Sequence, residues 1–397
     1  MERDERIARA IDTVDLDLAV ELCQEVSRIP SVLGDEGPLA AFLADTMREL
    51  GFGDVELQPV LPDRPNAIGE LEFGEGPRMV FTGHMDTKPV SHGWTVSEPF
   101  SGALIDGSVY GHGIMDMKAA LACQLVALVG VASSGVELQG TAAFAAVSDH
   151  MGDQLGSIAY FDAHHADLCV LGELTDNTVC LGHRGRYYFD VVVRGRSAHT
   201  VHKQRAINAN YLAALAVLEL EGSRLEPELA PGVGERFGTE TFMVPGRIYG
   251  GLPPGGPSMI PDECVIRVDC RPQPGVSASV VEAEIIRCLA AAKAHDARFD
   301  AEVVLADEKP GYLIDDDAEV VQMMVEALNG VRGDKSGSSL GVEGWLGDTA
   351  SFGEKVPTVI FGPGGEPVYC ADEHLTVADI HEATRTYAAF AALALGS

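Results

Sequence analysis

The sequence predicts an α/β fold in which a helix-covered, mainly parallel sheet forms one domain and a smaller α+β domain is inserted into it. Two observations support this prediction. Short apolar runs alternate with longer amphipathic stretches, as in parallel sheets whose crossovers are helices. The chain has 397 residues, which exceeds the usual size of one hydrophobic core. We place the larger domain at residues 1–182 and 311–397, and the inserted domain at 183–310.

The larger domain is expected to begin with two helices, at residues 15–27 and 36–50, because apolar residues recur there with helical spacing. A short apolar run at 79–82 has the length and composition of a buried strand, and Gly83 ends it. The remaining elements expected in this domain are a helix after Asp116, strands at 141–148 and 167–172, and a C-terminal helix at 378–395.

The pattern changes near His183, where the inserted domain is expected to begin. Polar and apolar residues alternate over 186–195, which predicts a strand with one buried face. A helix at 206–221, a strand at 264–270 and a helix at 278–294 follow. Strands and helices in this order predict a small sandwich.

Composition and charge exclude some classes of partner. The formal net charge is −32, from 60 acidic against 28 basic residues. This charge argues against binding to nucleic acid or to an anionic membrane surface. An acidic, well-solvated surface explains it without a dedicated cationic partner. No run reaches the roughly 18 apolar residues of a membrane span, so we expect no membrane association.

The cysteines and the N-terminus favour a cytoplasmic protein. Eight cysteines are scattered along the chain without any CxxC pair, which predicts buried free thiols in a reducing compartment. The first residues, MERDERIARAID, are charged and then amphipathic, and they lack the apolar core of a signal peptide.

Acidic and imidazole side chains follow several of the expected strands. His84 and Asp86 come just after the strand at 79–82, Glu173 follows the strand at 167–172, and Asp116 opens a helix. The carboxyl ends of strands in an α/β sheet form the usual ligand-binding edge. Histidine with carboxylates suits zinc or another borderline divalent cation. A single histidine after a strand is more often a capping or packing residue, so the prediction depends on the combination.

Longer segments around these residues resemble the acetylornithine deacetylase and succinyl-diaminopimelate desuccinylase family of two-zinc metallopeptidases. The resemblance covers nearly the whole chain, with the pieces in family order. These pieces are GHMDTKP at 83–89, GWTVSEPF at 93–100, DGSVYGHGIMDMKAA at 106–120, GELT at 172–175, VVRGRSAHT at 192–200, DCRPQPG at 269–275, GDTASFG at 347–353, FGPGG at 361–365 and DEHL at 372–375.

The resemblance implies one complete metal site, with His84, Asp116 and Glu173 as ligands of one divalent metal, expected to be zinc. It also implies that Asp86 orients His84, and that the peptide bond after Asp116 is cis. Three protein ligands and an open position are what catalytic zinc requires.

The second metal site of the family is not complete in this sequence. Where the family has the motif D-E-E, this chain has Asp149, His150 and Met151, so that a thioether replaces a ligand glutamate. Tyr369 stands where the family places its last ligand histidine. His150 replaces the glutamate that accepts a proton from water, and histidine can serve as acid or base near neutrality. Two alternatives stay open: His150 is itself a metal ligand, or the site is inactive.

Further roles are implied outside the metal site. His199 matches the histidine of a lid domain that reaches the active site of a dimer partner and polarises the scissile carbonyl. Arg271 matches a position associated with the substrate carboxylate, and a salt bridge with Asp269 is the alternative. Gly364, within the glycine-rich turn at 362–365, and Tyr369 are further candidates for substrate binding, although a plain turn is an alternative for the glycines.

We therefore expect a deacylase-like metallohydrolase that acts on the amide of an N-acylated amino acid or a related small molecule, and that forms a homodimer through residues 183–310, the lid domain. Its acid or base would be His150. One rival hypothesis is an enzyme repurposed for ring closure, acyl transfer or elimination on an amino-acid-like substrate. Another is an inactive protein that binds an amino-acid derivative.

Overall fold

The computed structural model describes residues 2–251, 258–333 and 339–396. The chain divides into two compact units. The larger unit contains Met1–Gly182, Ile314–Gly341 and Gly347–Ser397, and the smaller contains His183–Leu313 and Val342–Leu346. The smaller unit begins at His183, and the chain first returns to the larger unit at Ile314. The short segment Val342–Leu346 of the smaller unit was not expected from the sequence.

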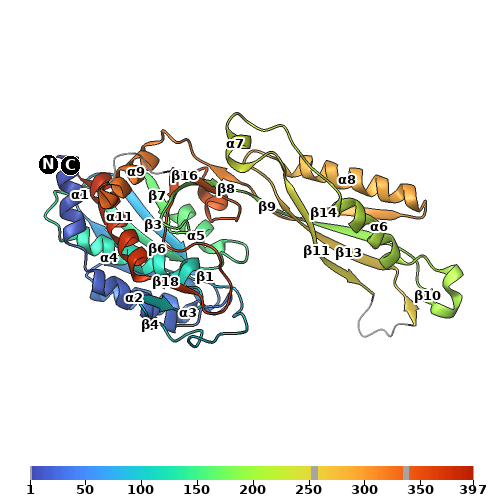
Figure 1. Cartoon of the computed structure of the whole chain (residues 1–397), viewed down its shortest axis with the longest axis horizontal. Helices are drawn as coiled ribbons and strands as arrows, with labels where there is room; N and C mark the ends of the chain where they lie inside the picture. Colours follow the sequence, from blue (N-terminus) through green and yellow to red (C-terminus); the bar gives the residue numbers. More distant parts are fainter. Residues whose placement is uncertain (1, 252–257, 334–338, 397) are drawn as a thin grey trace. The chain divides into compact units, whose positions relative to one another are not determined.

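A twisted sheet lies at the centre of the larger unit (Figure 1). Its strands run in the order β1-β2-β6-β3-β7-β17-β8. The neighbours β6, β3, β7 and β17 pair in parallel, whereas β1, β2 and β8 join antiparallel to their neighbours. The strands are β1 (Gly53–Leu61), β2 (Arg64–Glu72), β3 (Arg78–His84), β6 (Thr141–Val147), β7 (Leu168–Leu171), β8 (Val179–His183) and β17 (Thr358–Ile360). The α/β fold class is confirmed, with parallel strands at the centre and antiparallel strands at the flanks.

The sheet is buried on both faces because alternate residues of β3 pack against different helices. Phe81 contacts Tyr387 and Phe390 of α11 (Val377–Leu395), with ring centroids 5.2 and 6.1 Å away. Val80, the preceding residue, belongs to a buried cluster that includes Tyr160 of α5 (Leu155–Ala163). This two-sided burial explains why the strand reads as a continuous apolar run.

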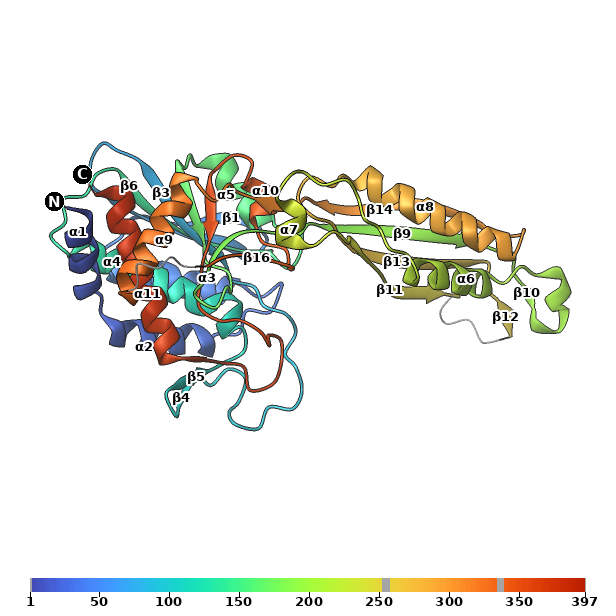
Figure 2. The same cartoon turned by 45° about the horizontal axis from the view of Figure 1, so that its top comes forward.

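The other helices of the larger unit are α1 (Arg3–Asp12), α2 (Leu16–Arg28), α3 (Gly37–Glu49), α4 (Ala119–Ala132), α9 (Glu319–Arg332) and α10 (Thr349–Phe352). A small second sheet contains β4 (Ala103–Ile105), β5 (Ser108–Tyr110) and β18 (His374–Thr376). α4 and α11 lie side by side (Figures 1 and 2). The termini also meet, because the Arg6 guanidinium donates to the Gly396 carbonyl at 2.8 Å.

The stretch Ile114–Ala132 is long and apolar enough to cross a membrane by length and composition alone. In this structure 89% of it is buried within the protein, as in the core helix of a folded domain. Its apolar character is therefore explained by packing.

The smaller unit is a four-stranded antiparallel sheet with two helices on one face (Figure 2). The strands run in the order β11-β13-β9-β14, with bounds Phe242–Gly250, Glu263–Arg271, Arg186–Arg194 and Asp300–Lys309. The helices are α6 (Ala209–Glu221) and α8 (Ala278–His295), and their buried residues share one core with alternate residues of β9 and β13. Shorter elements are β10 (Ala198–His199), η2 (Thr200–Arg205), α7 (Val233–Phe237) and β12 (Met259–Ile260). β15 (Tyr312–Leu313) and β16 (Leu340–Glu343) occur where the chain passes between the units.

All eight cysteines fall in described residues and are free thiols, as expected. Seven are buried, whereas Cys370 is only partly buried, so the expectation of uniform burial was wrong at that position.

Replacing Phe81 with alanine should lower the free energy of unfolding of the larger unit by about 3–5 kcal/mol, because it leaves a cavity between β3 and α11. Urea unfolding followed by tryptophan fluorescence measures this loss. The control is Val96→Ala, at a side chain that is about half exposed, which should change stability by less than about 0.5 kcal/mol. Equal effects of the two substitutions would contradict this account of the core.

Candidate metal centre

Three parallel strands bring the candidate site together at their carboxyl ends. β3 ends at His84, Glu173 lies two residues beyond β7, and His150 lies three residues beyond β6. β3 pairs in parallel with both β6 and β7. The three ends therefore lie at one edge of the sheet, where open α/β sheets bind ligands. All three side chains are buried.

The imidazole of His84 is held at both ring nitrogens. Nδ1 lies 2.8 Å from the backbone carbonyl oxygen of Asp86, so it donates its hydrogen there. Nε2 lies 3.0 Å from Asp116 Oδ1 and 3.8 Å from Glu173 Oε1. Burial lowers the pKa of His84, but the hydrogen bond and charge of Asp116 and the charge of Glu173 outweigh burial and raise the pKa to about 10. The two carboxylates beside His84 Nε2 therefore favour a positive charge at this point, from a proton on Nε2 or from a bound metal ion.

The environment of Glu173 indicates whether this group of side chains fits a metal ion. Its Oε1 is buried and has no hydrogen-bond partner among the described residues. Burial raises the pKa of Glu173 to about 7, against the opposing charges of His84 and His150. A buried carboxylate oxygen without a partner is costly, and a divalent cation would remove that cost. One imidazole nitrogen and two carboxylates form a donor set that zinc accepts.

Asp116 uses both of its carboxylate oxygens. It lies in the kinked segment η1 (Ile114–Lys118), and the peptide bond to Met117 is cis, as expected. Oδ1 accepts from His84, and Oδ2 accepts from the Tyr369 hydroxyl at 2.5 Å. Burial would raise the pKa of Asp116, but the hydrogen bonds from His84 and Tyr369 lower it to about 2. The tyrosine hydroxyl therefore occupies the oxygen that is not turned to His84.

His150 lies directly on the ring of His84. The ring centroids are 4.1 Å apart and the planes differ by 9°. Its Nδ1 lies 2.9 Å from Oδ1 of Asp348, which is fully buried. Burial and the charge of His84 lower the pKa of His150, but the Asp348 carboxylate outweighs them and raises it above its ordinary value.

The stacking geometry bears on which histidine can hold a metal. Ligand atoms of His84, His150 and Glu173 lie within 4.8 Å of one another. However, an imidazole binds a metal in its own ring plane, at about 2.0–2.1 Å. Two nearly parallel rings with centroids 4.1 Å apart cannot both place one ion in their planes at that distance. In this arrangement only one of the two rings would hold an ion in its plane, and the other would lie over the first ring.

Asp86 connects the two histidines. Its backbone carbonyl accepts from His84, and its carboxylate accepts from the backbone amides of His150 at 3.0 Å and Met151 at 2.7 Å. It therefore orients His84 through the main chain, whereas its side chain fixes the loop after β6.

A buried ion-pair network supports the same loop from the other side. Arg64 donates to both carboxylate oxygens of Glu36 at 2.7 Å and to Asp149 Oδ1 at 2.8 Å. Glu36 is fully buried, and the Arg64 side chain is only 15% exposed. The Asp149 backbone has a φ of 70°, in the left-handed region that non-glycine residues seldom adopt. The network thus stabilises an unfavourable backbone conformation next to His150.

Comparison with known proteins identifies the family. The model of peptidase family M20/M25/M40 matches residues 80–393, a span that includes every residue of the site from His84 to Tyr369. The chain belongs to peptidase family M20/M25/M40. It is thus a member of a metallohydrolase family, and the resemblance drawn from the sequence motifs is confirmed.

Relatives of known sequence and structure agree with this assignment. The chain is 30% identical to a succinyl-diaminopimelate desuccinylase of Methylorubrum extorquens over 92% of its own length and 96% of the relative's. A desuccinylase of Methylobacterium radiotolerans is 29% identical, with 94% and 95% covered. Among solved structures, the M20 metallo-carboxypeptidase of Sulfolobus solfataricus superposes with a TM-score of 0.78 at 17% identity, covering 95% and 99%. The YXEP protein of Bacillus subtilis, a dinuclear metal-binding M20 peptidase, gives 0.66 at 16% identity, covering 96% and 98%.

The larger unit of this M20 chain contains most of the site residues expected from the sequence. His84, Asp116 and Glu173 surround one point, with His150 and Tyr369 in contact with this group. Gly364 has another role in the fold: its carbonyl accepts from the Asp176 amide at 2.7 Å. A Cβ at Gly364 would lie 2.9 Å from Met115 Cβ, and its φ is 91°, so glycine is required there.

Two expected site residues lie in the smaller unit. The Arg271 guanidinium forms a bidentate ion pair with Asp269, at 2.8 and 2.9 Å, which is the alternative that the sequence left open. His199 is exposed on β10, and its Nδ1 accepts from the Val201 amide at 3.3 Å. Their roles at the substrate stay predictions.

Sequence reasoning missed Asp348, Arg64 and Glu36. Asp348 falls within the GDTASFG motif, which carried part of the resemblance, but no role was assigned to it. Its partner His150 is 198 positions away in the chain, so no local spacing connects them.

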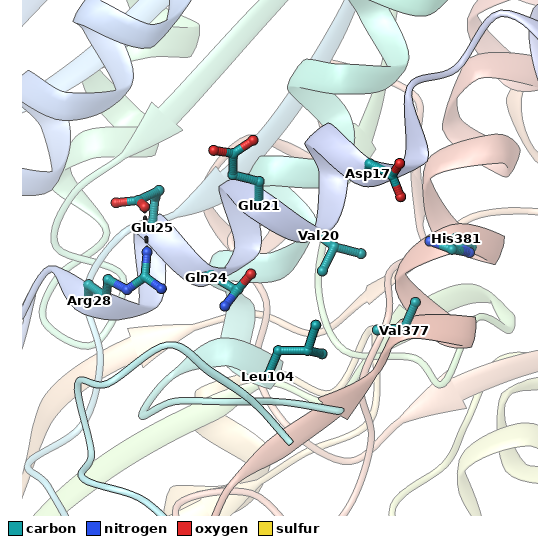
Figure 3. Close-up of a pocket in the computed structure, with 9 residues that line it drawn as sticks. All are labelled: Asp17, Val20, Glu21, Gln24, Glu25, Arg28, Leu104, Val377 and His381. Atoms are coloured by element: carbon teal, nitrogen blue, oxygen red, sulfur yellow. Dashed lines mark hydrogen bonds and ion pairs between the residues drawn. The ribbon is translucent and has the colours of Figure 1, made fainter. Parts of the chain in front are cut away.

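A cavity of about 430 Å³ lies between α2 and α11 (Figure 3). Asp17, Glu21 and Glu25 line it together with His381, and Glu25 forms an ion pair with Arg28. It contains none of the residues of the metal centre, so we do not assign the substrate to it.

Replacing Arg64 with methionine should destabilise the protein by about 3–5 kcal/mol, because two buried carboxylates lose their partner. Calorimetry measures the change in the unfolding transition. The matched control is Arg48→Met, since Arg48 pairs with Asp45 on the surface and such pairs contribute about 0–1 kcal/mol. A loss as small as that of the control would contradict the role given to this network.

Proposed function

We propose that this chain is a hydrolase that cleaves the amide of an N-acylated amino acid, with one divalent metal, expected to be zinc, held by His84, Asp116 and Glu173. The observation that carries the proposal is the buried Glu173 oxygen that accepts no hydrogen bond from the described residues, beside the His84–Asp116 pair, with the His150 imidazole lying on His84. The relatives named as succinyl-diaminopimelate desuccinylases support an N-acyl amino acid as the substrate class.

The metal would supply Lewis-acid polarisation of the substrate carbonyl and activation of water. His150 accepts a proton from water at Nε2 and returns it to the leaving nitrogen, because its Nδ1 is engaged by Asp348. Positioned proton transfer of this kind contributes on the order of 10²–10⁴ in rate. The histidine thus takes over the task of the glutamate that it replaces.

Two substitutions support a single metal. Met151 offers only a thioether where the family motif has a ligand glutamate. Tyr369 stands in the place of a ligand histidine, and its hydroxyl donates to Asp116 Oδ2. With Oδ1 turned to His84, that hydrogen bond engages the other Asp116 oxygen, which would otherwise be open to a second ion. The Tyr369 side chain therefore supports Asp116, a proposed ligand of the remaining site.

We also propose a homodimer through the smaller unit, with His199 and Arg271 of the lid contributing to substrate binding. On α6, the exposed side chains of Tyr211 and Leu218 lie on the same face of the helix, two turns apart. β11 is an edge strand of its sheet, and its residues Ile248 and Tyr249 are exposed. An edge strand with apolar side chains is a ready surface for pairing with another chain. Arg271 could bind a substrate carboxylate after releasing Asp269.

His150→Ala should lower turnover of N-acyl amino acids by about a hundredfold or more, with the metal retained, because it removes the proton acceptor and no ligand. Release of the free amine measures turnover, and elemental analysis measures the metal. Glu173→Gln is the matched comparison, since it should lose metal and activity together. If His150→Ala loses its metal, His150 is a ligand and the proposed roles are wrong.

Hydrolysis itself is tested in water labelled with ¹⁸O. The wild-type enzyme should place one labelled oxygen in the released carboxylic acid. Turnover of an amino-acid derivative without uptake of label would favour the repurposed, non-hydrolytic enzyme. Binding without any turnover would favour the inactive binding protein.

If His199 acts at the site of a partner subunit, mixing His199→Ala chains with His84→Ala chains should restore part of the activity. The expected recovery requires heterodimers in which one site has both residues. Unmixed variants serve as the baseline, and analytical ultracentrifugation confirms exchange. Absence of recovery in exchanged samples would exclude action between protomers.

A further inference from the structure

We infer that Asp348 is a positioning residue that holds His150 in the tautomer with its lone pair on Nε2. The inference rests on the proposed function, in which Nε2 accepts the proton. The resemblance to the family motifs assigned no role to Asp348.

The contact itself determines the tautomer. Asp348 Oδ1 lies 2.9 Å from His150 Nδ1, and Asp348 is fully buried. An ionised carboxylate only accepts hydrogen bonds, so Nδ1 must carry the hydrogen and Nε2 the lone pair. Burial would raise the pKa of Asp348, but the neighbouring His150 lowers it, which favours the ionised form. The same carboxylate stabilises the imidazolium that forms once Nε2 has taken a proton.

The ring of His150 is oriented by other contacts as well. One of its faces stacks on His84, and its backbone amide donates to Asp86 at 3.0 Å. These contacts fix where the ring lies, but neither contact engages a ring nitrogen of His150. The choice between the two tautomers is therefore left to Asp348.

The two segments that carry the pair are tied together independently of it. Gln154 is fully buried, and its side-chain amide donates to the Gly347 carbonyl at 3.2 Å and accepts from the Ser351 hydroxyl at 2.5 Å. This clamp joins the loop after β6 to the start of α10. Because the clamp does not use Asp348, an isosteric change at Asp348 should leave the fold and the loop in place.

The experiment compares Asp348→Asn and Asp348→Ala with wild type, using zinc-loaded protein labelled with ¹⁵N-histidine. The His150 signals are assigned by their absence in His150→Gln, and recorded above the pKa of the imidazole. We expect the wild-type hydrogen on Nδ1, and a shift toward the Nε2–H tautomer in both variants, with zinc content unchanged. For N-acyl amino acids kcat should fall about a hundredfold or more, with KM little changed.

Ser351→Ala is the matched control, since it removes one hydrogen bond of the clamp while the Gln154–Gly347 hydrogen bond and the Asp348 carboxylate stay in place. It should keep the wild-type tautomer and kcat. An unchanged tautomer in Asp348→Asn and Asp348→Ala would overturn the inference, as would an equal loss of kcat in Ser351→Ala. If the tautomer shifts as expected but the wild type hydrolyses no N-acyl amino acid, the proposed function fails while the positioning role stands.

Discussion

The closeness of His84, Asp116 and Glu173 in a water-poor interior is the constraint on which the rest of the site depends. His84 Nε2 lies 3.0 and 3.8 Å from two carboxylate oxygens, and the more distant one, Glu173 Oε1, accepts no hydrogen bond from the described residues. Buried negative charge of this density requires a compensating cation. The parallel strands bring these charged groups together, because their carboxyl ends lie at one edge of the sheet. The same arrangement of side chains would hold a divalent metal.

The side chains of His150 and Tyr369, at two positions that differ from the family motifs, each contact a member of the candidate site. Tyr369 donates to Asp116, and His150 stacks on His84 and bonds to Asp348. Tyr369 thus supports Asp116, and His150 packs on His84. This pattern is what the proposed working centre with one metal requires, since a decayed site need not keep such contacts to its former ligands.

Much of the fold, and the grouping of His84, Asp116 and Glu173 at one edge of the sheet, could be predicted from the sequence, because both depend on local patterns. Strand β3 is a continuous apolar run ended by glycine, and His84 and Glu173 are placed by their distance from strand ends. The contacts of Asp348 with His150 and of Arg64 with Glu36 and Asp149 could not be predicted, since these partners are 198, 28 and 85 positions away. The flanking antiparallel strands were missed for a similar reason: their pairing is decided by the neighbour in the sheet and not by their own pattern.

The number of metal ions per chain tests the central claim most directly. Purified protein, equilibrated with excess zinc and then dialysed, is analysed for zinc by mass spectrometry against protein concentration. The account predicts one ion per chain, because Tyr369 occupies the second oxygen of Asp116 and Met151 offers no carboxylate. Two tightly bound ions per chain would contradict it.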